Sequence, residues 1–181
     1  MIERSSYLRK VQQYLANIGI SASALRNQGA SGVIKEARTF LGDMDLSILK
    51  QIPVAEYGLW LDQITESLKD RFPGDSKHWG AARKAANIVL AYAFMNFDLR
   101  NEYNLERLSD SMETPLDSYA AEKLRDWACK TAQVTLPIWQ GVSKLERKES
   151  DEYQTIAAQY AKAEEMPRAC LDVLLWSPAL A

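Results

Sequence analysis

The segment from Trp79 to Phe94 constrains the fold of this chain more than any other. It reads WGAARKAANIVLAYAF, and small or apolar residues occupy most positions around the helix that it predicts. A helix that is apolar on nearly every side is buried by other elements rather than laid on the surface. We therefore predict a central helix here, with the rest of the chain packed around it.

The remaining chain also follows the period of an α-helix. Apolar residues recur three or four positions apart in most segments, and no run of alternating β-branched residues predicts a strand. We predict an all-α fold of about eight to ten helices, in one domain over residues 1–181. The expected helices span 7–18, 33–41, 53–70, 79–94, 105–108, 118–132, 138–145, 153–163 (capped by Asp151) and 169–176.

Composition limits the kind of function. The formal net charge is −2 and the isoelectric point is near 5.5, so a generally nucleic-acid-binding surface is not expected, although a local basic face is compatible with an acidic body. Two cysteines, Cys129 and Cys170, and a single histidine, His78, predict no disulfide scaffold, metal site or cofactor. With no signal peptide or membrane span in the pattern, we expect a cytoplasmic protein with no membrane partner.

Lys84 and Asp117 are the residues most suggestive of chemistry. Lys84 lies among alanines in the apolar helix, and a lysine held in an apolar wall is a usable nucleophile. Asp117 lies at the start of a later helix. The plain alternatives are a solvated lysine and a helix N-cap. If the two converge in one cleft, an amine and a carboxylate can attack and stabilise a sugar C1′ carbon, which is the chemistry of cutting a base from DNA.

A local basic stretch precedes and enters the apolar helix. It consists of Lys77, His78, Trp79 and Gly80, followed by Arg83. The N-terminus of a helix can present backbone N–H groups to a phosphate, and the cations add to this attraction. We predict that these residues contact DNA, with an ordinary loop between helices as the alternative.

Near the C-terminus, Asp172 and Trp176 are one helical turn apart. A carboxylate with a flat ring one turn away can hold a base by hydrogen bonding and stacking. The alternative is a C-terminal helix that docks its tryptophan into the core.

These strings together resemble the helix-hairpin-helix DNA glycosylases. Residues 80–90 resemble the Gly-x-x-Arg-Lys-x-Ala-Asn helix of that family, whose lysine is the nucleophile in bifunctional members. Residues 115–118 resemble its Val-Asp-Thr-His segment, whose aspartate is essential. The resemblance covers residues 79–124, and it implies two helical lobes around a cleft, with Lys84 as nucleophile and Asp117 as catalytic carboxylate.

Within that family, the archaeal-type 8-oxoguanine glycosylases are the most similar group. The gap of 33 positions between Lys84 and Asp117 resembles theirs. In that group an N-terminal glutamine and a C-terminal Asp with a Trp one turn later grip the flipped base. By this resemblance, Gln28, Asp172 and Trp176 form the base pocket.

The chain also departs from the family pattern. Residues 74–80 replace the glycine-rich hairpin, Ser118 and Tyr119 replace the Thr-His pair, and cluster cysteines are absent. A divergent member with its own substrate is implied, similar to a bacterial anti-phage glycosylase that removes glucosylated hydroxymethylcytosine. The expected partner is double-stranded DNA with a modified base, bound by a monomer; 8-oxoguanine repair with AP-lyase activity is the second expectation.

Two other functions stay open at this point. Arg71 and His78 have an Arg-(x6)-His spacing that loosely resembles the nuclease motif of all-α HEPN ribonuclease toxins, although Pro73 and Gly74 interrupt it. The third possibility is a helical partner-binding module without catalysis, which would tolerate replacement of Lys84 and Asp117.

Overall fold

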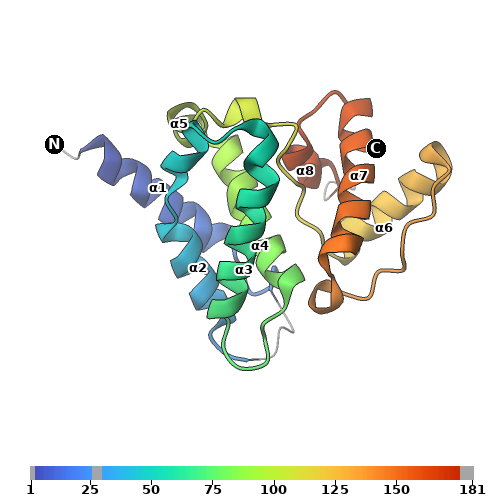
Figure 1. Ribbon diagram of the computed structural model, residues 1–181, viewed down its shortest axis with the longest axis horizontal. Helices are drawn as coiled ribbons and strands as arrows, with labels where there is room; N and C mark the ends of the chain where they lie inside the picture. Colours follow the sequence, from blue (N-terminus) through green and yellow to red (C-terminus); the bar gives the residue numbers. More distant parts are fainter. Residues whose placement is uncertain (1–2, 26–29, 176–181) are drawn as a thin grey trace.

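The computed structural model describes residues 3–25 and 30–175, and within these ranges the chain is helical with no β-strand (Figure 1). The all-α prediction is confirmed. The α-helices are α1 (Arg4–Gly19), α2 (Val33–Asp43), α3 (Tyr57–Arg71), α4 (Trp79–Met95), α5 (Phe97–Glu102), α6 (Ser118–Trp127), α7 (Arg147–Ala163) and α8 (Leu171–Leu175). Short 3-10 turns cover Leu46–Lys50, Val54–Glu56, Leu105–Leu108, Val142–Lys144 and Arg168–Cys170, and a π-turn over Ala128–Ala132 extends α6.

Helix α4 is the central element, as its composition predicts. Of its 17 residues, 14 are buried, and it packs against α1, α3 and the turn at Val142–Lys144. Its N-terminal end allows a very close approach. A Cβ atom on Gly80 would lie 2.3 Å from the carbonyl oxygen of Val142 and 2.7 Å from the Cβ of Leu145. Glycine is therefore required where the segment around Val142 crosses α4.

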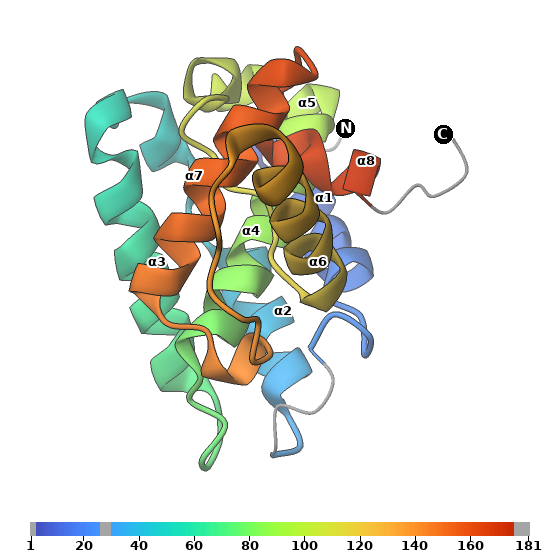
Figure 2. The same cartoon turned by 90° about the vertical axis from the view of Figure 1, so that its right-hand side faces the viewer.

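The buried side chains form two cores. The first lies mainly among α1 to α5, and the second lies among α6 to α8 and the segment 133–146. We call these parts the first lobe and the second lobe. Figure 1 shows α6, α7 and α8 together at the right of the molecule, and Figure 2 views them from that side. Residues 109–117, called the linker below, join the two lobes. Trp79, at the start of α4, packs against the second core.

The predicted helix over residues 138–145 is wrong. Gln133 has a positive φ of 55° where the π-turn ends, and the chain then runs without helix until the 3-10 turn Val142–Lys144. Gly141, inside the predicted range, has a φ of 102°, which is incompatible with an α-helical backbone. The apolar residues of this segment are not buried together. Trp139 and Leu145 pack against the second core, Val142 packs against the first, and Ile138 is exposed.

α7 starts earlier than predicted, and α5 is a helix that was not predicted. α7 begins at Arg147, so Asp151 lies inside the helix and is not its cap. α5 occupies Phe97–Glu102, in a stretch whose polar composition gave no prediction of a helix. The Asn96 side chain accepts a hydrogen bond from the Leu99 N–H at 3.0 Å and caps this short helix.

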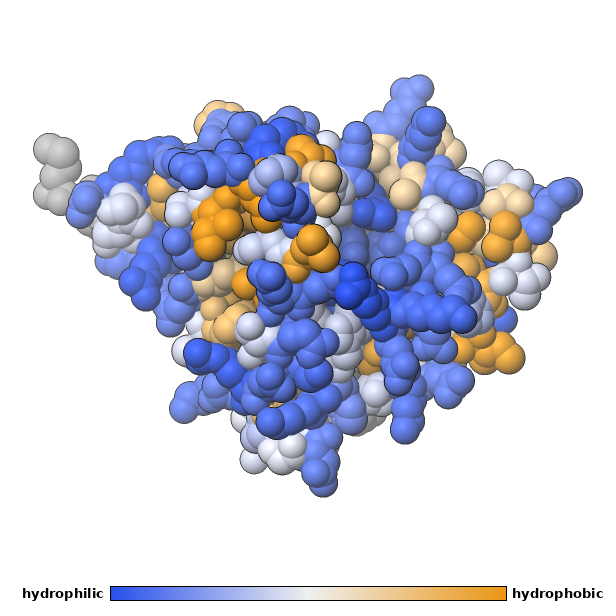
Figure 3. Space-filling model, in the orientation of Figure 1, coloured by the Kyte–Doolittle hydropathy of each residue, from blue (hydrophilic) through white to orange (hydrophobic). Residues whose placement is uncertain are grey.

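The face of the molecule seen in Figure 1 is mostly hydrophilic. Figure 3 shows hydrophobic residues in separate small groups on the face of Figure 1, with hydrophilic residues between them. Within the described ranges, no helix has the length and apolarity needed to span a lipid bilayer.

Candidate active site

A cavity of about 710 Å³ lies where the two lobes meet. The first lobe contributes the C-terminal end of α1, the turn after it and one side of α4, and the second contributes the start of α6, residues 139–143 and α8. This arrangement has the form of two helical lobes around a cleft. Among the lining side chains are Lys84, Tyr92, Asp117, Tyr119, Trp139 and Asp172.

Helix α4 places Lys84 at the cavity through its regular spacing. Lys84, Ile88, Ala91, Tyr92 and Met95 all line the cavity, and their intervals of three and four positions define one stripe of the helix. The remaining stripes of α4 are buried in the cores. Lys84 is therefore the only cation on the face of α4 that borders the cavity.

Asp117 reaches the same cavity from the start of α6. Its Oδ2 lies 3.2 Å from Lys84 Nζ, while its Oδ1 accepts hydrogen bonds at 3.0 Å from the N–H groups of Tyr119 and Ala120. Only 7% of the Lys84 side chain and 15% of the Asp117 side chain are exposed. The N-cap interpretation and the catalytic interpretation of Asp117 thus use different oxygens, and the cap orients the carboxylate toward the lysine.

Asp172, on α8, is the third charged group of the cavity lining. Burial raises the pKa of its carboxyl to about 6, and the negative charge of Asp117 adds to this rise, while the positive charge of Lys84 opposes it. Two carboxyls and one amine therefore share a partly enclosed space. Near neutral pH, a carboxyl with this pKa can accept or donate a proton during a reaction.

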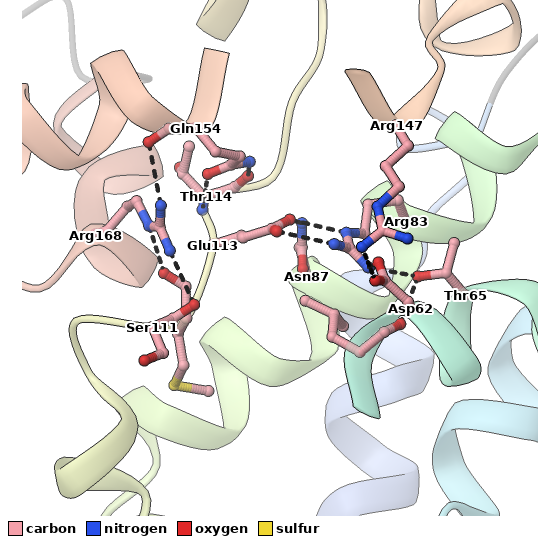
Figure 4. Close-up of polar contacts among 12 residues, drawn as sticks. Asp62, Thr65, Arg83, Asn87, Ser111, Glu113, Thr114, Arg147, Gln154 and Arg168 are labelled. Carbon is pink, nitrogen blue, oxygen red and sulfur yellow. Dashed lines mark hydrogen bonds and ion pairs between the residues drawn. The ribbon is translucent and has the colours of Figure 1, made fainter. Parts of the chain in front are cut away.

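The prediction that Arg83 contacts DNA is wrong. Only 3% of the residue is exposed, and its guanidinium donates to both Glu113 oxygens at 2.9 Å and forms an ion pair with Asp62 at 3.1 Å (Figure 4). Its Cζ also lies 5.0 Å from the ring centroid of Trp79. Adjacent residues on a helix point about 100° apart, so Lys84 borders the cavity while Arg83 enters the protein interior.

The other predicted DNA contacts divide into covered and accessible residues. Gly80 is buried beneath Val142, so its backbone cannot meet a phosphate. His78 and Trp79 are partly buried, and Lys77 is exposed. The phosphate grip predicted at the start of α4 is therefore incomplete, and a role for Lys77 stays a prediction.

Two predicted base-pocket residues, Gln28 and Trp176, lie outside the described residues. The third, Asp172, shares the cavity with Lys84 and Asp117. Residues separated by 33 and 55 positions are thus brought together, as the resemblance implies.

The aromatic part of the cavity was not foreseen. Tyr92, Tyr119 and Trp139 line it, and Trp139 makes an edge-to-face contact with Tyr153, with ring centroids 5.6 Å apart. Aromatic side chains at helical spacing usually indicate core. No local pattern distinguished these three, because their place at the cavity depends on how the lobes pack.

The residues proposed for a ribonuclease do not meet at this site. Arg71 ends α3, and its Cζ lies 5.1 Å from the ring centroid of Phe40. His78 is the residue before α4. Neither Arg71 nor His78 lines the cavity.

Comparison of the chain with protein families, characterised proteins and solved structures gives no match. Within the part of the chain that the structure describes, no group of three acidic, histidine or cysteine side chains could hold a metal ion. The function must therefore be inferred from the geometry of the cavity and from the sequence motifs that contribute its side chains.

Proposed function

We propose that this chain is a DNA N-glycosylase, which flips a modified base out of duplex DNA and excises it to leave an abasic site. The observation that carries the proposal is the Lys84–Asp117 pair, 3.2 Å apart at the wall of a cavity large enough for a base. An amine and a carboxylate on one wall supply both the nucleophile and the charge stabilisation that this reaction uses.

The bond that breaks joins the sugar C1′ to a base nitrogen. The electron pair leaves with the base, which takes up a proton, and positive charge grows on the sugar. Asp117 stabilises this charge, because its carboxylate is held in place by the N–H groups at the start of α6.

Two routes complete the reaction. In the bifunctional route, Lys84 passes a proton to Asp117 and its amine attacks C1′ as the base leaves. Opening of the sugar ring at the C1′–O4′ bond then gives a Schiff base, and β-elimination expels the 3′ phosphate and nicks the strand. In the monofunctional route, water attacks C1′, Asp117 takes its proton, and Lys84 positions the sugar or phosphate. Both routes use the same pair of side chains.

The size of the cavity favours a bulky base. Its volume of about 710 Å³ falls within the range of about 300–1,000 Å³ that holds drug-sized ligands. Aromatic rings can stack on a base, and the hydroxyls of Ser21, Ser23 and Ser143 on the lining can bond to an attached sugar. Glucosylated hydroxymethylcytosine, and with it a role in anti-phage defence, is therefore our first substrate, and 8-oxoguanine is the second.

Exposed lysines near the cavity supply phosphate contacts that Arg83 cannot. The Nζ of Lys123 lies 5.5 Å from the ring centroid of Tyr119, a lining residue, and exposed Lys144 follows the lining residue Ser143. Together with Lys77, these side chains would give a small local attraction for DNA on an acidic protein.

The test is incubation of the purified protein with duplexes carrying glucosylated hydroxymethylcytosine, hydroxymethylcytosine, 8-oxoguanine or uracil, each with and without borohydride. We expect base release from at least one duplex. A borohydride-trapped adduct that is lost in Lys84→Gln identifies the bifunctional route. Abasic sites without an adduct, lost in Asp117→Asn, identify the monofunctional route. No base release from any of these duplexes contradicts the proposal.

A further inference from the structure

The linker that carries Asp117 is held along its length by side chains from outside it. Arg168 donates hydrogen bonds to the carbonyl oxygens of Ser111 at 2.8 Å and Met112 at 2.7 Å. The Gln154 side chain donates to the Thr114 carbonyl at 2.7 Å and accepts from the Thr114 N–H at 3.2 Å. Gln154 lies on α7, so its bonds fix the linker to the second lobe, whereas Arg168 lies in the turn Arg168–Cys170, which contacts α4, α7 and α8 (Figure 4).

Glu113 fixes the same linker to the first lobe. Its Oε1 accepts from Arg83 Nη2 at 2.9 Å, and its Oε2 accepts from Arg83 Nε and Asn87 Nδ2, both at 2.9 Å. Arg83 and Asn87 lie one turn apart on α4. A bidentate Arg–carboxylate pair specifies geometry as well as energy, because both oxygens must match the planar guanidinium.

The two ion pairs that join α4 to the linker share a register. Arg83 and Lys84 are adjacent on the helix, and their partners Glu113 and Asp117 are four positions apart on the linker. Pro115 lies between these partners, and a proline fixes its own φ and restricts the residue before it. A shift of the linker at Glu113 would therefore be carried to Asp117 through a short, stiff connection.

We propose that Glu113 is a positioning residue, whose bidentate pair with Arg83 sets the linker against α4 so that Asp117 meets Lys84 at the cavity. The role of Glu113 in bringing Asp117 to Lys84 does not depend on the proposed function. Only the expected effect of Glu113 on base release rests on the proposed function.

Glu113→Gln is the variant to test, with Asp62→Asn as the matched control. Both replace a carboxylate partner of Arg83 by its neutral isostere. Arg83 keeps one carboxylate in either variant, so the interior retains charge compensation. Only Glu113 belongs to the linker, because Asp62 lies on α3.

The first measurement requires no DNA. Folded protein is treated with formaldehyde and cyanoborohydride, and the methylation rate of Lys84 is followed by mass spectrometry. We expect Glu113→Gln to raise this rate several-fold, because a displaced Asp117 no longer covers the amine, and we expect Asp62→Asn to leave it as in the wild type. An unchanged rate in Glu113→Gln, or an equal rise in both variants, overturns the proposal.

The second measurement follows base release in single turnovers at saturating protein. Glu113→Gln should lower this rate about 10- to 100-fold, the loss typical of a misplaced catalytic group, while DNA affinity stays within about twofold of the wild type. A merely structural role would lower the melting temperature and leave the rate of the folded protein unchanged. If the wild type releases no base, the proposed function fails, and the methylation result still decides the role of Glu113.

Asn87→Ala carries the same test if Glu113→Gln does not fold. It removes one of the three hydrogen bonds to Glu113 and leaves the Arg83 pair intact. We expect a smaller increase in Lys84 methylation than a full loss of Glu113 would give. Wild-type methylation in this variant would overturn the proposal in that case.

Discussion

Arg83 and Lys84 are neighbours on α4, yet they occupy two contrasting regions of the molecule. Arg83 is surrounded by the carboxylates of Glu113 and Asp62 and the hydroxyl of Thr65, and it does not border the cavity. Lys84 has the carboxylate of Asp117 as its ion-pair partner and opens on the cavity. A buried charge with several partners is held by the structure around it, whereas a charge with one partner beside a cavity stays accessible to a bound molecule.

The largest expected effect is on the Arg83 side. Arg83→Met keeps much of the side-chain volume but leaves Glu113 and Asp62 buried without their shared cation. We expect a loss of about 3–5 kcal/mol in the free energy of unfolding, the usual result of removing one partner from a buried ion pair. Denaturant unfolding measures it, with Lys84→Gln as the neighbouring control. A loss no larger than that of Lys84→Gln would remove the contrast between the two regions.

The next effect is on the Lys84 side and concerns activity. Asparagine is a good N-cap, so Asp117→Asn should keep α6 and change the melting temperature little. On the proposed mechanism, we expect base release to fall about 10²- to 10³-fold, because Asp117→Asn removes the charge that would stabilise the sugar in either route. Single-turnover kinetics on a duplex from which the wild type releases a base would measure this fall. Activity near that of the wild type would leave Asp117 with a capping role alone.

The third prediction concerns Asp172 in the cavity and the effect of its carboxyl on the pH dependence of stability. Its folded-state pKa of about 6 lies above the ordinary value of 3.8, so the folded protein holds this proton more tightly than the unfolded chain. The stability gained in this way is complete below the ordinary value and is lost as pH rises through about 6.

Asp172→Asn keeps the side chain neutral at every pH. We expect it to raise the free energy of unfolding by about 2 kcal/mol near pH 7.5 and to change it little near pH 4. Denaturant unfolding at the two pH values gives the comparison, and Asp126→Asn, on an exposed carboxyl, is the control. An equal gain at both pH values would mean that the carboxyl is not perturbed in the fold.

The smallest expected effect on stability tests whether the buried charge network around Arg83 extends to Arg147. Arg147 pairs with Asp62 from the start of α7, but 59% of its side chain is exposed. An ion pair in contact with water contributes about 0–1 kcal/mol, so Arg147→Gln should shift the melting temperature only slightly. A loss comparable to that of Arg83→Met would extend the buried network to the surface of the second lobe.

The helices were largely predictable, because their signals are local. The turn at Leu105–Leu108 and the starts of α2, α4 and α6 match the expected boundaries. The segment 138–145 failed because its apolar spacing suits a helix, yet Trp139 and Leu145 pack on the second core, Val142 packs on the first and Ile138 is exposed. Such burial depends on a partner surface that the segment itself does not encode.

The candidate site was predictable only in part. The convergence of Lys84, Asp117 and Asp172 followed from the resemblance, and the structure places them around one cavity. The error at Arg83 has a physical cause: its partners Asp62 and Glu113 lie 21 and 30 positions away, and sequence distance gives no sign of them.

The sequence by itself determined most of the helices, the burial of α4 and the N-cap at Asp117, since these depend on periodicity and on neighbours within a turn. Tertiary structure decided which of two adjacent cations enters the interior and which borders the cavity. The two side chains project from α4 in different directions. The packing of α3, the linker and the second lobe around α4 decides what each side chain contacts.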